Sequence, residues 1–105
     1  MGGVFVGIDV SKARLDVAFR PDGTDLSVSN DARGIARLVR RLKTAKPQCV
    51  VLEATGGYEL AALERLMANS VPVVVANPRQ VRQFARASGR LAKLKFPPIF
   101  DQIPQ

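Results

Sequence analysis

One stretch constrains the fold more than any other, the run Val50-Val-Leu-Glu-Ala-Thr-Gly-Gly-Tyr58. Its first three residues are apolar and mostly β-branched, a pattern typical of a short strand buried inside a sheet. Glu53 follows at once, and a carboxylate leaving a buried strand loses hydration unless a cation meets it. Gly56-Gly57 then allows a tight turn before a helix. Because ligands of α/β sheets bind beyond the carboxyl ends of the strands, Glu53 is a candidate site residue.

A second apolar run with the same ending lies at the start of the chain. Gly3-Val-Phe-Val-Gly-Ile-Asp9 is followed by the polar pair Ser11-Lys12 after one more valine. If the two strands are parallel neighbours, Asp9 and Glu53 leave the same edge of the sheet on backbones about 4.8 Å apart. Two carboxylates at that separation can share a divalent cation. For either acid alone a polar strand end in water is the favoured interpretation, but two acids at matching ends of two buried runs shift the balance modestly towards a metal site.

Length and composition predict one small soluble domain. The 105 residues are 47% hydrophobic, in short runs broken by polar turns, and no run approaches the roughly 20 residues of a membrane span. The N-terminus lacks the pattern of a signal peptide, so we expect a cytoplasmic protein without a membrane partner. Cys49, the only cysteine, is expected to be a small buried hydrophobe. Without histidine, the chain offers no ligand set for zinc.

The charge balance predicts a polyanionic partner. Sixteen Lys and Arg against nine Asp and Glu give a net charge of +7 and a pI near 10.5, which favours nucleic acid before an anionic membrane. A predicted third helix begins at Asn77-Pro78 and runs through Ser88. Cations recur there every three or four residues with no acid between them: Arg79, Arg82, Arg86, Arg90 and Lys93. Like charges at this spacing repel, so we interpret the row as a phosphate-contacting stripe rather than a solvated face.

The remaining pattern predicts an α/β fold of ribonuclease-H type, with a five-stranded mixed sheet of order 3-2-1-4-5 and element order βββαβαβα. The expected strands are Val4–Asp9, Leu15–Arg20, Thr24–Ser29, Cys49–Glu53 and Val71–Ala76, the last covered on both faces. A first helix, capped by Asn30 or Asp31, carries the apolar stripe Ile35, Leu38, Val39 and Leu42. A second helix spans Tyr58 to Asn69 and is expected to bury Leu60, Leu63 and Met67.

Four segments of the chain resemble, in order, the motifs of the DEDD-type transposases. That family includes the Piv and MooV invertases, and the N-terminal domain of its members is similar to the RuvC junction resolvase. The four segments are Gly7-Ile-Asp-Val-Ser-Lys12, Leu52–Tyr58, Asn77–Phe84 and Ala87–Lys93. The resemblance implies an insertion-sequence protein of DNA transposition or recombination with a ribonuclease-H-like domain over residues 1–93. In that domain four acids bind Mg²⁺ or Mn²⁺ for DNA strand cleavage and transfer, and Asp9 and Glu53 match the first two. Some members are guided by a structured RNA.

The chain departs from the family pattern after Lys93. The family continues Thr-Asp-x-x-Asp-Ala, whereas this sequence has Leu94-Lys-Phe-Pro-Pro98, so both later acids are lacking and 94–105 is a divergent, proline-rich tail. Against the resemblance, we also expect the family's second domain, which carries a nucleophilic serine, to be missing, as in a truncated or frameshifted element. We expect weak metal binding and no DNA cleavage by this chain alone, since Asp101 is a poor replacement. The exposed tail residues predict a homodimer contact: Phe96, Ile99, Phe100 and Ile103.

Three other interpretations stay open at this point. A Holliday-junction-resolvase-like nuclease could find its missing acids in the tail or in a dimer partner. Actin-like and sugar-kinase ATPases also end their first strand in Gly-Ile-Asp, and Gly56-Gly57 at a helix start could hold a phosphate. A complete ATPase, however, needs a second such domain. The last interpretation is an inactive structural remnant.

Overall fold

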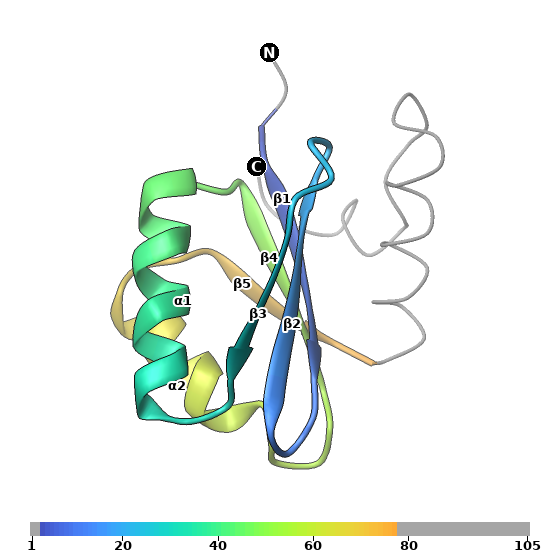
Figure 1. The fold of residues 1–105 in the computed structure, drawn as a ribbon, viewed down its shortest axis with the longest axis vertical. Helices are drawn as coiled ribbons and strands as arrows, with labels where there is room; N and C mark the ends of the chain where they lie inside the picture. The colour runs from blue at the N-terminus through green and yellow to red at the C-terminus, as the bar shows by residue number, and fades with distance from the viewer. Residues whose placement is uncertain (1–2, 78–105) are drawn as a thin grey trace.

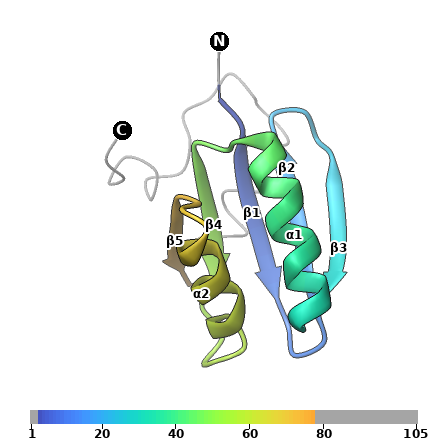
Figure 2. The ribbon, with the colours of Figure 1, turned by 90° about the vertical axis from the view of Figure 1, so that its left-hand side faces the viewer.

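The fold is taken from a computed structural model, which describes residues 3–77. The predicted third helix, its stripe of cations and the 94–105 tail lie outside the described residues. Within the described part, a five-stranded sheet has helices α1 (Ala32–Ala45) and α2 (Leu60–Ala68) packed against one of its faces (Figures 1 and 2).

The strands follow the predicted order. They are β1 (Phe5–Val10), β2 (Arg14–Arg20), β3 (Asp25–Ser29), β4 (Cys49–Glu53) and β5 (Val73–Ala76). The sheet order is β3-β2-β1-β4-β5, in which β1, β2 and β3 form an antiparallel meander. Strand β4 pairs parallel to β1, and β5 pairs parallel to β4. The predicted mixed sheet is therefore confirmed, and β1 and β4 are neighbours.

The core lies between the sheet and the two helices because apolar residues occupy every second position of the inner strands. Val6, Ile8 and Val10 of β1 point to the helices. From β4, Val50 and Leu52 join them. The predicted stripe of α1 is confirmed, since its four residues are at most 5% exposed: Ile35, Leu38, Val39 and Leu42. Alternation then turns the intervening strand residues to the opposite face of the sheet.

Helix α1 begins at a side-chain cap and approaches β3 closely. The Asp31 carboxylate accepts a 2.8 Å hydrogen bond from the Gly34 N–H, so Asp31 rather than Asn30 is the N-cap. Hydrogen bonds from the Gly34 N–H and the Ser29 hydroxyl lower the pKa of Asp31. A Cβ at position 34 would overlap the carbonyl oxygen of Ser29. Glycine is thus required where the helix meets the end of β3.

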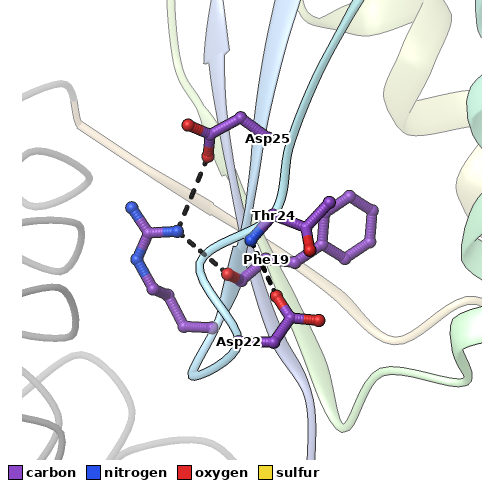
Figure 3. Close-up of polar contacts among 5 residues, drawn as sticks. Phe19, Asp22, Thr24 and Asp25 are labelled. Atoms are coloured by element: carbon purple, nitrogen blue, oxygen red, sulfur yellow. Dashed lines mark hydrogen bonds and ion pairs between the residues drawn. The ribbon is translucent and has the colours of Figure 1, made fainter.

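Polar contacts close the turn between β2 and β3 (Figure 3). The Asp22 carboxylate accepts a 2.8 Å hydrogen bond from the Thr24 N–H. Nη1 of Arg20 donates to the Phe19 carbonyl at 2.9 Å and lies 3.6 Å from Oδ1 of Asp25. The Asp25 side chain is mostly exposed, so this ion pair contributes at most about 1 kcal/mol. Side-chain contacts thus help to fix the register of the hairpin.

Helix α2 buries a different face from the one predicted. Ala62 and Leu66 are fully buried, whereas Leu60 and Met67 are 53% and 63% exposed and Leu63 is only partly buried. The helix has nine residues and begins two residues later than expected. Apolar side chains occur nearly all round it, and a shift of one residue turns the buried stripe by about 100°. The prediction of Leu60 and Met67 as core residues was therefore wrong.

The prediction for β5 was only partly right. The strand is confined to Val73–Ala76, and Val75 is 40% exposed although it was expected to be covered. Within the described sheet β5 is an edge strand, which leaves this side chain uncovered. Cys49 is buried as expected, and burial raises the pKa of its thiol to about 11. Between residues 3 and 77 no helix is long and apolar enough to cross a membrane.

Candidate active site

Asp9 and Glu53 leave matching ends of two neighbouring parallel strands. The last registered pair of β1 and β4 is Ile8 with Leu52, and each acid is the next residue along its strand. The backbones of paired strands lie about 4.8 Å apart. Because the preceding residues point to the helices, both acids belong to the opposite face of the sheet. The structure thus brings together the two acids that the sequence predicted as a pair.

The two carboxylates differ in environment. Asp9 is exposed, whereas Glu53 is only 5% exposed. Oε1 of Glu53 accepts a 2.7 Å hydrogen bond from the backbone N–H of Val10, which extends the β1–β4 ladder beyond its last residue pair. A charge-assisted bond of this kind compensates for the burial of the carboxylate and fixes its position beside Asp9. Since a carboxylate can accept at about four positions, this bond is compatible with metal binding.

A second glutamate shapes the loop that follows Glu53. Oε1 of Glu59 accepts three hydrogen bonds of 3.0 Å each, from the N–H and hydroxyl of Thr55 and from the N–H of Gly57. These donors, the Thr55 N–H foremost, lower the pKa of Glu59 to about 2. The loop turns through Gly56 and Gly57 at φ values of 71° and 133°, which favour glycine. Glu59 was not singled out in the sequence analysis. The adjacent Gly56 and Gly57 could have indicated it, because a glycine turn exposes backbone N–H groups from which a nearby carboxylate can accept hydrogen bonds.

Asn30 joins the two loops that flank the acids. Its side-chain Nδ2 donates to the carbonyl of Ser11 at 2.9 Å and to the carbonyl of Tyr58 at 3.0 Å. Ser11 follows Asp9 by two residues, and Tyr58 belongs to the loop after Glu53. One amide group therefore ties the segments that carry the two carboxylates. The sequence suggested only a helix cap at this position.

A groove of about 500 Å³ opens on the face of the sheet that carries Asp9, over β1, β2 and β3. Asp16 lies in it directly opposite Asp9 in the β1–β2 register. Its carboxylate accepts a 2.7 Å hydrogen bond from the Ser27 hydroxyl, which in turn accepts from Arg14 at 2.6 Å. The alternation of polar and apolar residues along β2 could have revealed Asp16 as a neighbour of Asp9. Within the described residues, no three His, Cys, Asp or Glu side chains group closely enough to hold a metal by themselves.

The predicted basic stripe, Arg79 to Lys93, lies outside the described residues. The geometry of the candidate site therefore rests on the carboxylate edge and its supporting loops. Two carboxylates at the carboxyl ends of the central strands, with a groove on the adjoining face of the sheet, form an edge where hard cations and polar ligands can bind.

Solved structures with this fold include RuvC. The chain is similar to Thermus thermophilus RuvC in complex with a Holliday junction substrate, at 20% identity and a TM-score of 0.60 over 78% of this chain and 69% of that one. A second structure of Thermus thermophilus RuvC aligns at 25% identity with a TM-score of 0.58, over 86% of this chain and 71% of that one. The fold is therefore that of a RuvC-like, ribonuclease-H-like domain, as predicted.

The family follows from the sequence comparison. The family model of the DEDD-type IS110 transposases matches residues 6–94, which is most of the chain. The chain belongs to this transposase family, and the resemblance inferred from the four motifs is confirmed. A search of curated proteins gave no match.

Proposed function

We propose that this chain is the nucleic-acid-binding RuvC-like domain of an insertion-sequence transposase, with Asp9 and Glu53 as its metal-binding catalytic carboxylates. Membership of the family and the RuvC-like fold support a role in DNA transposition or recombination. The observation that carries the assignment of residues is the placement of Glu53 beside Asp9 by the Val10 N–H.

The donor set of this edge fits a hard divalent cation. Mg²⁺ is commonly held in proteins by one or two carboxylates while it keeps several waters. Asp9 presents an exposed carboxylate, and Glu53 presents one whose position is fixed by the backbone. When bound, Mg²⁺ or Mn²⁺ would activate the attacking oxygen and stabilise the leaving one. The part played by the chain is to hold two negative oxygen ligands at one point of the sheet edge.

The proposed site lacks two of the family's four acids. This proposal rests on the resemblance, which implies two further acids after Lys93, whereas the sequence there reads Leu94-Lys-Phe-Pro-Pro98. Two carboxylates bind a divalent cation more weakly than four because less negative charge compensates for its loss of water. We therefore propose that the metal is weakly bound and that this chain alone does not cleave DNA.

DNA is the proposed partner, with a structured RNA as a second nucleic acid. Support comes from the net charge of +7 and from the five cations between Arg79 and Lys93, which carry no interleaved acid. The similar RuvC was solved with a Holliday junction, so branched DNA is a probe to include. A second copy of the chain, docked through the apolar tail, is a further proposed partner, and a monomer in light scattering at high concentration would contradict it.

Fluorescence anisotropy with duplex, branched and structured RNA probes tests the proposal. The variant Arg82→Ala/Arg86→Ala/Arg90→Ala should reduce the slope of log K against log salt by about three units, since each phosphate contact contributes about 0.9. An unchanged slope would show that the cations form only a solvated face. Absent binding at low salt would favour an inactive remnant.

A junction-resolving nuclease is the alternative that the similarity to RuvC favours. In that case a second copy of the chain would supply the acidic residues that the site lacks. Metal-dependent cleavage of branched DNA that disappears in Asp9→Asn would establish this function. No cleavage by the wild type at high protein concentration, with branched DNA bound, would exclude it.

A further inference from the structure

Helix α1 exposes a row of cations on the side that faces away from the sheet. Between Ala32 and Ala45 the helix contains no Asp or Glu. Its exposed cations are Arg33, Arg37, Arg40, Arg41 and Lys43, named here the α1 basic face. Helix α1 covers one face of the sheet (Figure 2), and strand alternation assigns Asp9 and Glu53 to the other, so this row is separate from the candidate active site.

The α1 basic face has a defined geometry. Arg33, Arg37 and Arg40 are spaced by four and three residues and therefore form one line opposite the buried stripe of the helix. That line covers about 10 Å of helix axis at 1.5 Å per residue. One strand of duplex DNA advances about 3.4 Å along the duplex axis per phosphate, so a line of this length can reach more than one phosphate of a strand.

A groove runs beside this line. Its volume is about 270 Å³, and its walls are Arg37, Arg40, Arg41 and Thr44 of α1 together with Leu26 of β3. The guanidinium of Arg41 lies 5.0 Å from the centre of the Phe19 ring, a cation–π contact that restricts its orientation. Three arginines around one groove provide several donors for an oxyanion, whereas the Thr44 hydroxyl already donates to the Arg40 carbonyl at 3.2 Å.

Stability of the domain does not explain these charges. Like charges three or four residues apart on a helix repel each other. The only ion pair among residues 3–77 joins Arg20 to Asp25, so no salt bridge in the described part neutralises the α1 basic face. At the start of the row, Arg33 lies near the N-cap Asp31 and helps to lower the pKa of that carboxyl. An external polyanion is the simplest compensation for the row.

We infer that the α1 basic face binds the phosphodiester backbone of a nucleic acid, on the opposite side of the sheet from Asp9 and Glu53. A bilayer fits less well, because the exposed residues of α1 include no large apolar side chain that could insert among lipids. No contact to base edges is implied, so the surface binds without sequence preference. The inference rests on the proposed function for its class of partner, but it does not depend on metal or on the carboxylates.

The test is a salt titration in EDTA of wild type, Arg37→Gln, Arg40→Gln and the double variant, with duplex DNA and structured RNA as probes. Glutamine keeps a long side chain and good helix propensity while it removes the charge. Arg65→Gln, at an exposed position of α2, is the control for a change of one charge. Circular dichroism and thermal unfolding confirm that each variant is folded.

We expect each single α1 variant to lower the salt slope by about one unit and the double variant by about two, with little change in Arg65→Gln. Between 50 and 200 mM salt, the loss of affinity of the double variant should then be about tenfold smaller than that of wild type. If the α1 variants lower the salt slope equally for DNA and RNA, the surface contacts the backbone that the two share. If the slope falls for one probe alone, that nucleic acid is the partner.

Comparison with Arg82→Ala/Arg86→Ala/Arg90→Ala separates the inference from the proposed function. If only that triple variant lowers the slope, the α1 surface is a solvated face and the inference is overturned while the proposed function stands. If only the α1 variants lower the slope, the inference stands and the proposed phosphate contact through Arg79 to Lys93 is overturned. Slopes that fall equally in Arg65→Gln and Arg40→Gln reflect net charge alone and also overturn the inference. Binding to phosphatidylserine vesicles without binding to nucleic acid would overturn both.

Discussion

Oε1 of Glu53 lies 2.7 Å from the backbone nitrogen of Val10, the residue that follows Asp9. A side chain at the end of β4 thereby completes the hydrogen bonding of β1 at the point where the candidate site begins. The contact gives Glu53 two separable properties, an acceptor for a buried N–H and a negative charge beside a second carboxylate. Substitutions that remove one property or both should therefore have different effects.

Glu53→Gln retains an acceptor for the Val10 N–H and removes the charge, whereas Glu53→Ala removes both. A buried donor without an acceptor costs about 1–3 kcal/mol, so we expect Glu53→Ala to lower the free energy of unfolding by that amount and Glu53→Gln by less. Both should weaken Mn²⁺ binding. Urea unfolding and Mn²⁺ titration followed by electron paramagnetic resonance measure the two effects. Equal stabilities of the two variants would argue against a structural role for the Val10 contact.

Asp9 should behave differently, because it is exposed. Asp9→Asn is expected to change the free energy of unfolding by no more than about 0.5 kcal/mol while it weakens Mn²⁺ binding as strongly as Glu53→Gln. Asp16→Asn, directly across the β1–β2 pair, is the matched control for loss of an exposed carboxylate on the same face. If the two variants weaken Mn²⁺ binding equally, the metal sits over β1 and β2 rather than at the β1–β4 edge.

Asn30 should keep the loops after β1 and β4 at a fixed distance, because its side chain donates hydrogen bonds to the carbonyls of Ser11 and Tyr58. We expect Asn30→Ala to lower the free energy of unfolding by about 1–2 kcal/mol, at roughly 0.5–1.5 kcal/mol per net hydrogen bond. Amide hydrogen exchange should accelerate in both loops at once. Asn69→Ala is the matched control, because Asn69 makes a single local bond to the Arg65 carbonyl. Acceleration confined to one loop would show that Asn30 does not couple them.

The sheet was predictable from the sequence because its information is local. Apolar runs in β1 and β4 and alternation in β2 reveal which residues are buried, and two acids at strand ends indicate the edge of the candidate site. The supporting contacts were not predictable. Asn30 and Tyr58 are 28 residues apart, and the Asn30 side chain donates to the backbone carbonyl of Tyr58. Every residue has such a carbonyl, so the sequence does not reveal the contact. The face of α2 was missed for a different reason, since its apolar residues do not define a single stripe.

Gly34 provides a test of the close approach between α1 and β3. In an exposed helix, Gly→Ala stabilises by about 1 kcal/mol through helix propensity. Here the added methyl group would overlap the Ser29 carbonyl, so we expect Gly34→Ala to destabilise by about 1–3 kcal/mol instead. The reverse substitution Ala61→Gly, at an exposed position of α2, measures the propensity term alone. A stabilised Gly34→Ala variant would mean that the helix stands farther from β3.

Glu59 should make the stability of the domain depend on pH in the acid range. Its pKa in the folded state is about 2, below the ordinary value of 4.5, because the Thr55 and Gly57 N–H groups donate to the charged carboxylate. The folded state therefore binds fewer protons than the unfolded state between these values, and stability falls as the pH drops from 4.5 towards 2. Above pH 4.5 the contribution of Glu59 is fully present.

Asp31, whose pKa is also lowered, contributes in the same direction, so the comparison must isolate Glu59. Glu59→Gln cannot ionise, and its unfolding free energy should fall less steeply than that of wild type as the pH is lowered below 4.5. Urea unfolding at pH 7, 5, 4 and 3 gives both curves. If the two curves of unfolding free energy against pH are parallel, the Glu59 carboxylate does not accept the hydrogen bonds of the 55–57 loop. Other contacts would then have to hold the loop after Glu53 in place.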